Sequence, residues 1–176
     1  MHQPAMTSRT TGQTFEAAAE RFARKTLKLS RPGEGVPLST ASRYTLLALR
    51  PQNRPDAFER QTCAEGLWVT RAGGLVWVEC VGSIGTTYRP GLRRSDSTRK
   101  LGGTLNAVLA VCRYWQVAVP KVVLVTTHCP AERSGAAEYL YWAVVAPFGR
   151  DNVELWELDP AGTARHLALP TATAFI

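Results

Sequence analysis

The sequence predicts an α/β (α+β) domain with a central mixed sheet, flanking helices and a C-terminal β-hairpin. Three stretches carry this prediction. Residues 67–81 hold two apolar runs around a glycine turn, 97–115 have helical apolar spacing, and 121–127 are typical of a strand covered on both faces. At 176 residues the chain is long enough for one domain. We expect a flexible arm over 1–13 and a single domain over 14–176.

A first helix is predicted from Thr14, because Phe15, Ala18, Ala19 and Phe22 recur at helical spacing. A second stripe on this helix is basic. It is either a solvated face suited to the end of a helix or a face that meets phosphates. Its candidate nucleic-acid-binding residues are Arg21, Lys25 and Lys28, with Arg24 between them.

The predicted hairpin ends in an acidic residue, Glu79, within an otherwise apolar strand. An unpaired carboxylate in such a strand is costly, so Glu79 needs a partner. A metal ion would supply one, and a hydrogen bond from Arg71 or from a helix residue would supply another. Strand alternation places Trp77, Glu79 and Val81 on one face, and we expect Glu79 to point toward the basic loop that follows the hairpin and the start of the helix over 97–115.

A basic loop over 82–97 follows the hairpin and contains a single acid, Asp96. It is either a surface loop kept in water by arginine or a guide for phosphates, with Tyr88 available to stack on a base. The candidate contacts in and just after it are Tyr88, Arg89, Arg93, Arg94, Arg99 and Lys100.

The remaining elements follow from periodicity and turn residues. The glycines at 102 and 103 indicate close packing of the 97–115 helix, because glycine otherwise weakens a helix. A strand is predicted over 43–50, a helix passing into a strand over 136–145, and a pair of strands over 153–158 and 163–169 around a turn.

Charge and cysteine content limit the partners and the compartment. The formal net charge is +7 and the pI is about 9.6, which favours a nucleic-acid partner, DNA ahead of RNA, and no membrane. Other protein subunits are further candidate partners. No signal peptide or membrane span is visible, and the scattered cysteines read as core thiols, so we expect a cytoplasmic protein. A zinc site at His128 and Cys129 remains an alternative.

The order of helix, hairpin ending in a carboxylate, helix and central strand resembles the restriction-endonuclease-like, or PD-(D/E)xK, nuclease superfamily. The stretch from Gly73 to Val81 matches that family's second hairpin strand, so the resemblance implies a nuclease-like core and the glutamate role for Glu79. It also implies Mg²⁺ as cofactor, with Glu79, Glu65 and Glu20 as candidate metal ligands and Glu79 and Lys100 as candidate catalytic residues.

The chain departs from the family pattern at two positions. Val81 stands where the family has lysine, a role that Lys100 or Arg99 would take from the next helix. The family's aspartate falls near Gly66, and Glu65 beside it can serve only if the strand begins after it or carries a bulge.

Three functions follow from these observations. The departures favour a nucleic-acid-binding protein with an incomplete metal site, acting as a subunit of a nucleoprotein assembly. An active Mg²⁺-dependent DNA endonuclease using Glu79 is the first alternative. A protein–protein interaction subunit without a nucleic-acid role is the second, since five tryptophans could form a contact face.

Overall fold

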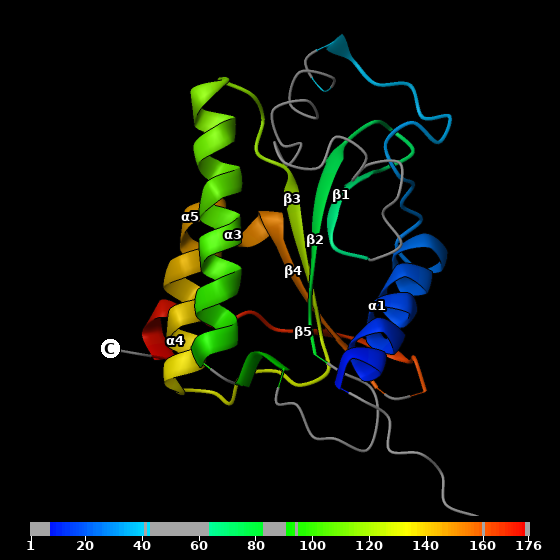
Figure 1. Ribbon diagram of the computed structural model, residues 1–176. Helices are drawn as coiled ribbons and strands as arrows, with labels where there is room; N and C mark the ends of the chain where they lie inside the picture. Colours follow the sequence, from blue (N-terminus) through cyan, green and yellow to red (C-terminus); the bar gives the residue numbers. More distant parts are fainter. Residues whose placement is uncertain are drawn as a thin grey trace, which may run out of the picture.

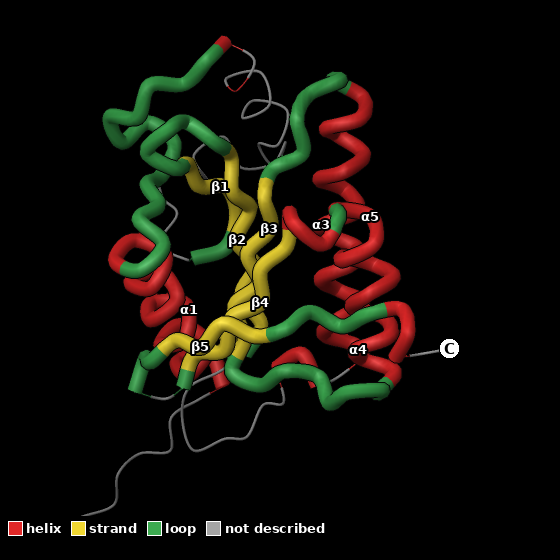
Figure 2. Tube along the Cα trace, turned by 180° about the vertical axis from the view of Figure 1, so that it is seen from behind, coloured by secondary structure: helices red, strands yellow, loops and turns green. Residues whose placement is uncertain are grey.

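A five-stranded mixed sheet separates two layers of helices in the computed structural model (Figure 1). The structure describes residues 8–40, 42, 64–82, 91–93, 95–159 and 161–174. Helix α1 (Ser8–Lys25) covers one face of the sheet, and α3 (Ser95–Tyr114) with α4 (Gly135–Leu140) covers the other, as the view from behind also shows (Figure 2). The predicted α/β class with a mixed sheet is confirmed. The predicted strand over 43–50 lies outside the described residues.

The strands follow one another across the sheet in chain order. The three inner strands are parallel, and each outer strand is antiparallel to its neighbour. Their bounds are β1 (Gly66–Val69), β2 (Leu75–Val81), β3 (Lys121–Thr126), β4 (Val153–Leu158) and β5 (Ala164–Leu167). The predicted hairpin over 67–81 is therefore confirmed as the β1–β2 pair, with Val69 opposite Leu75 beside the turn.

Each face of the sheet has its own core, and strand alternation assigns the residues to it. Val76, Val78 and Cys80 of β2 pack with the α1 side, where Phe15 and Phe22 are also buried. Trp77 and Val81 pack on the opposite side, among the residues that α3 and α4 bury. The central strand β3 is buried from Val122 to Thr126, as its β-branched sequence predicts.

Two predicted boundaries are wrong. The first helix begins at Ser8 rather than Thr14, so helix extends into the segment predicted as an arm. The stretch predicted as a helix passing into a strand stays helical: α4 continues as one π-helical turn, η2 (Tyr141–Val145), and then α5 (Ala146–Phe148). The two valines that suggest a strand there, Val144 and Val145, are instead buried beneath helices.

The close packing predicted for the third helix occurs at one of its two glycines. A Cβ on Gly102 would lie 2.9 Å from the Cβ of Ala143 in η2, whereas a Cβ on Gly103 meets nothing within 4 Å. Gly102 therefore lets α3 approach the following helical segment. Short 3-10 turns complete the fold: η1 (Gly91–Arg93), η3 (Arg150–Asn152) and η4 (Ala172–Ala174).

Candidate metal and nucleic-acid site

Glu79 lies near the carboxyl end of β2, on the face of the sheet that α3 covers. Its neighbours on that face, Trp77 and Val81, pack into the α3 core, as strand alternation predicts, whereas residues 83–90 of the basic loop lie outside the described residues. Only 9% of Glu79 is exposed. Its hydrogen-bond donor is neither Arg71, which is exposed, nor a helix residue: the indole Nε1 of Trp77 donates to Glu79 Oε1 over 2.7 Å.

Glu65 comes to the same place from the start of β1. The β1–β2 pairing ends at Gly66 and Val78, and just beyond it the Cys80 backbone N–H donates to the Glu65 carboxyl group, whose charge acts on Glu79. The strand begins after Glu65, and Gly66 has a φ of +104°, a conformation that favours glycine. The condition that the sequence set for Glu65 to serve beside Glu79 is thus met.

Burial and the charge of a neighbouring glutamate raise the pKa of both carboxyl groups. Burial raises the pKa of Glu79 to about 7; the Trp77 hydrogen bond lowers it in part, and the charge of Glu65 raises it further. Burial also raises the pKa of Glu65, helped by the charge of Glu16, while a hydrogen bond from the Cys80 backbone N–H and the charge of Lys100 act in the opposite direction.

Lys100 and Glu16 complete the group around Glu65. Lys100 projects from the second turn of α3 and is exposed, and its positive charge acts on Glu65. Glu16 comes from α1, and its negative charge acts on Glu65. Sequence reasoning missed Glu16, although it lies one helical turn before Glu20. Arg99, beside Lys100, is also exposed.

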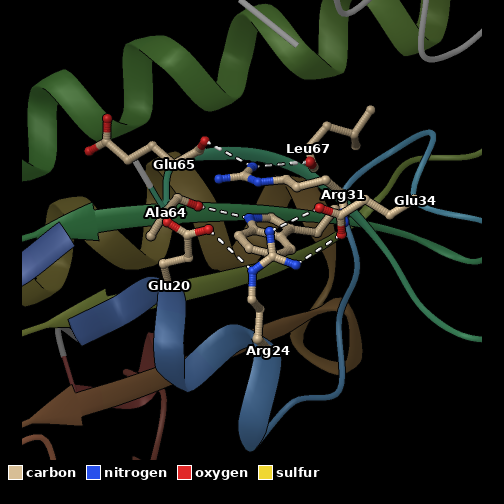
Figure 3. A network of polar contacts seen from close by, with 8 residues as sticks. Glu20, Arg24, Arg31, Glu34, Ala64, Glu65 and Leu67 are labelled. Carbon is tan, nitrogen blue, oxygen red and sulfur yellow. Dashed lines mark hydrogen bonds and ion pairs between the residues drawn. The ribbon is translucent and has the colours of Figure 1, made fainter. Parts of the chain in front are cut away.

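Glu20, predicted as a metal ligand, has a different partner. Arg24 Nε donates to Glu20 Oε1 over 3.2 Å, and the same guanidinium forms two bonds to Glu34, of 2.9 and 3.1 Å (Figure 3). Glu20 therefore belongs to a surface network on α1, and the carboxylate of α1 whose charge acts on Glu65 is Glu16.

A buried arginine fixes the outer edge of β1 next to this network. The guanidinium of Arg31, 5% exposed, stacks over the indole of Trp68 at 3.7 Å from the ring centroid. Its Nη1 donates to the backbone carbonyls of Glu65 and Leu67, at 3.4 and 3.3 Å (Figure 3). Arg31 thus holds the backbone from which the Glu65 side chain projects.

The predicted nucleic-acid contacts are placed only in part. Arg21 and Lys25 are exposed on α1, and Lys28 is exposed just beyond its end. The backbone of Arg93 lies in η1, whose first residues pack on the end of β3: Leu92 N donates to Thr126 Oγ1 and to the His128 carbonyl. Tyr88, Arg89 and Arg94 lie outside the described residues.

Within the described part of the chain, no three His, Cys, Asp or Glu side chains form a group that could hold a metal ion. The zinc alternative at His128 and Cys129 therefore has no third ligand there. Cys80 and Cys112 are buried, as predicted, and Cys129 is half-buried; Cys63 lies outside the described residues.

Two other surface features lie away from these acids. Trp115, at the end of α3, and Trp142, in η2, are about half exposed, at 53% and 57%. A cavity of about 620 Å³ opens beside β4 and β5, lined by Cys129, Arg133, Arg150 and neighbouring residues. It contains neither Glu65 nor Glu79.

No family model, curated protein or solved structure matches this chain. No helix among the described residues is long and apolar enough to cross a membrane.

Proposed function

We propose that this protein acts on nucleic acid through a restriction-endonuclease-like core with a C-terminal β-hairpin, and that Glu79 and Glu65 hold Mg²⁺ in a phosphodiesterase site. One observation carries the proposal: Glu65, half-buried just before β1, lies close to the buried Glu79, and both carboxyl groups have raised pKa values. This supports the endonuclease alternative over the incomplete site that the sequence favoured.

The residues fit a divalent cation of this kind. Mg²⁺ keeps several waters and usually takes one or two protein carboxylates together with substrate phosphates, so a third protein ligand is not required. When Glu79 and Glu65 are both ionised their charges repel, and a cation bound between them would remove that repulsion. Lys100 then supplies the positive charge that Val81 lacks.

Each residue has a separate task in this site. Bound Mg²⁺ would act as a Lewis acid on the phosphodiester and lower the pKa of water. Glu79 and Glu65 supply the anionic oxygens that hold it, and Lys100 faces the charge that develops on the phosphate. Arg21, Lys25 and Arg99 offer exposed positive charge for the phosphate backbone.

Cleavage of plasmid and linear DNA in the presence of Mg²⁺ tests the proposal. We expect E79Q and E65Q to abolish cleavage, and K100A to reduce it strongly. E16Q should alter the rate, while E20Q is the matched control on the same helix and should cut like the parent protein. Equal activity of E79Q and the parent would contradict the proposed site.

A second candidate function is binding without cleavage, as a subunit of a nucleoprotein assembly. The valine at position 81 and the lack of a third acidic or histidine ligand among the described residues favour it. A protein that binds labelled oligonucleotides with steep salt dependence, yet cuts none of them with Mg²⁺ or Mn²⁺, would select this candidate.

A further inference from the structure

The sheet contains two tryptophan–glutamate pairs of the same design. Trp77 Nε1 donates to Glu79 Oε1 over 2.7 Å, and Trp156 Nε1 donates to Glu154 Oε2 over 2.9 Å. In each pair the two residues are two apart on one strand, so their side chains leave the same face. The pair on β4 can therefore be compared directly with the pair at Glu79.

The difference lies in the remaining carboxylate oxygen. Glu154 Oε1 forms an ion pair with Lys121 from the adjacent strand, so this carboxylate has both an indole and a cation. For Glu79, no lysine or arginine forms an ion pair among the residues that the structure describes. Its neighbour is another acid, Glu65. The Glu79 pair thus has the same indole donor as the Glu154 pair, without a counterpart of the Lys121 ammonium group among the described residues.

The indole of Trp77 is held on several sides. Trp77 pairs with Leu67 across β1 and with Val122 across β3. Its ring packs against the cluster that includes Val108 and Cys112 of α3. A donor fixed in this way restricts the rotation of the carboxylate that it bonds.

We propose that Trp77 is a positioning residue of this site: its N–H occupies Glu79 Oε1 and so presents Oε2 to the cation. The inference rests on the proposed function, because the cation is the Mg²⁺ of that site. Trp77 itself does not touch the metal or the phosphodiester. Lys121 at Glu154 marks the equivalent position that a cation would fill at Glu79.

Binding of Mn²⁺ alone, measured by the EPR signal of the free ion, tests this role. W77F removes the donor and keeps an aromatic ring, and we expect its Mn²⁺ affinity to fall about tenfold, the effect of losing a hydrogen bond to a charged group. W156F is the matched control, because it breaks the same bond at a carboxylate that already has a lysine. Its Mn²⁺ affinity should equal that of the parent.

A double-mutant cycle separates positioning from a general loss of structure. In the E79Q background, W77F should cause no further loss of Mn²⁺ affinity, whereas a structural defect would add to that of E79Q. Luminescence of bound Tb³⁺ gives a second readout: excitation of the indole should sensitise emission from the parent and from W156F. E79Q should weaken this emission, because one of the two carboxylates that hold the ion is lost. Emission from the parent tests whether an indole lies close to the bound ion, even if W77F does not fold.

The outcomes distinguish the two proposals. Mn²⁺ binding by the parent with equal affinity in W77F would overturn the role of Trp77 and leave the metal site standing. Absence of sensitised Tb³⁺ emission from a parent that binds Mn²⁺ would also overturn it. No binding of either ion by the parent would overturn the proposed function and this inference together.

Discussion

Replacing Glu79 by glutamine should stabilise the protein above neutral pH. The buried carboxyl group has a pKa of about 7, against an ordinary value of 4.5. Between these values the folded protein keeps a proton on Glu79 that the unfolded chain has released. Because the folded state then binds more protons, its stability falls as the pH rises through this window.

The magnitude follows from the two pKa values. Each pH unit between them is worth 1.36 kcal/mol, so ionising Glu79 costs the folded state at most about 3 kcal/mol above pH 7. The raised pKa of Glu65 adds a cost of the same sign. Glutamine carries no charge and keeps an acceptor for the Trp77 indole. E79Q should therefore match the parent near pH 4.5 and exceed its unfolding free energy by up to about 3 kcal/mol at pH 8.

Urea unfolding of both proteins between pH 4.5 and pH 8 measures this difference. E154Q is the opposite control: burial raises the pKa of Glu154, but the hydrogen bonds from Lys121 and Trp156 outweigh it, and the pKa ends below its ordinary value. E154Q should be less stable than the parent across this range, and the deficit should shrink only below pH 4.5, so urea unfolding of this variant is also measured at lower pH. A difference between E79Q and the parent that does not change with pH would refute the reasoning.

Three further predictions concern Arg31, the two glycines of α3 and the loop arginines. R31K keeps the charge but loses the planar stack and the two carbonyl contacts at β1, so the unfolding free energy should fall by about 1–2 kcal/mol in urea. G102A should lower the free energy of unfolding by about 1–3 kcal/mol, because the added methyl group would push α3 away from Ala143 in η2. G103A places its methyl group in open space and should raise the same free energy by about 0.5–1 kcal/mol, as urea unfolding would show. R93A combined with R94A should weaken oligonucleotide binding measured by fluorescence anisotropy and lower the salt slope by about one unit for each lost contact; an unchanged slope would remove these arginines from the interface.

The elements that the sequence predicts correctly have one clear periodicity and clear boundaries. The β1–β2 hairpin alternates around a glycine turn, and α3 has an unbroken apolar stripe. The segment over 136–145 fails because Val144 and Val145 favour a strand locally, while burial against neighbouring helices stabilises a helix. Tertiary packing there overrides the strand preference of valine, and a single sequence does not show which helices will pack together.

The direction of a side chain in the candidate site is predictable from the sequence where it depends on strand alternation alone. It is not predictable where it depends on how two elements pack together. Strand alternation predicts the direction of Glu79, and it also places Trp77 on the same face, a neighbour that can donate as well as pack. The choice between Glu16 and Glu20 depends on how α1 rotates against the sheet. The place of Glu65 depends on the positive φ of Gly66, which ends the regular strand.

We infer that the arrangement at Glu79 serves the proposed cation site rather than the stability of the fold. A folded domain has a stability of roughly 5–15 kcal/mol, so a cost of up to about 3 kcal/mol from one ionised carboxylate is a large fraction. The same sheet shows that this fold can avoid such a cost, since Glu154 receives Lys121 from the adjacent strand. At Glu79 the position next to the carboxylate holds a second acid instead. Perturbed pKa values often mark functional sites, and under the proposed function a bound cation would offset the cost of ionising Glu79 and Glu65. Millimolar Mg²⁺ at pH 8 should accordingly raise the unfolding free energy of the parent and leave that of E79Q unchanged; equal shifts in both proteins would show that the cation binds elsewhere.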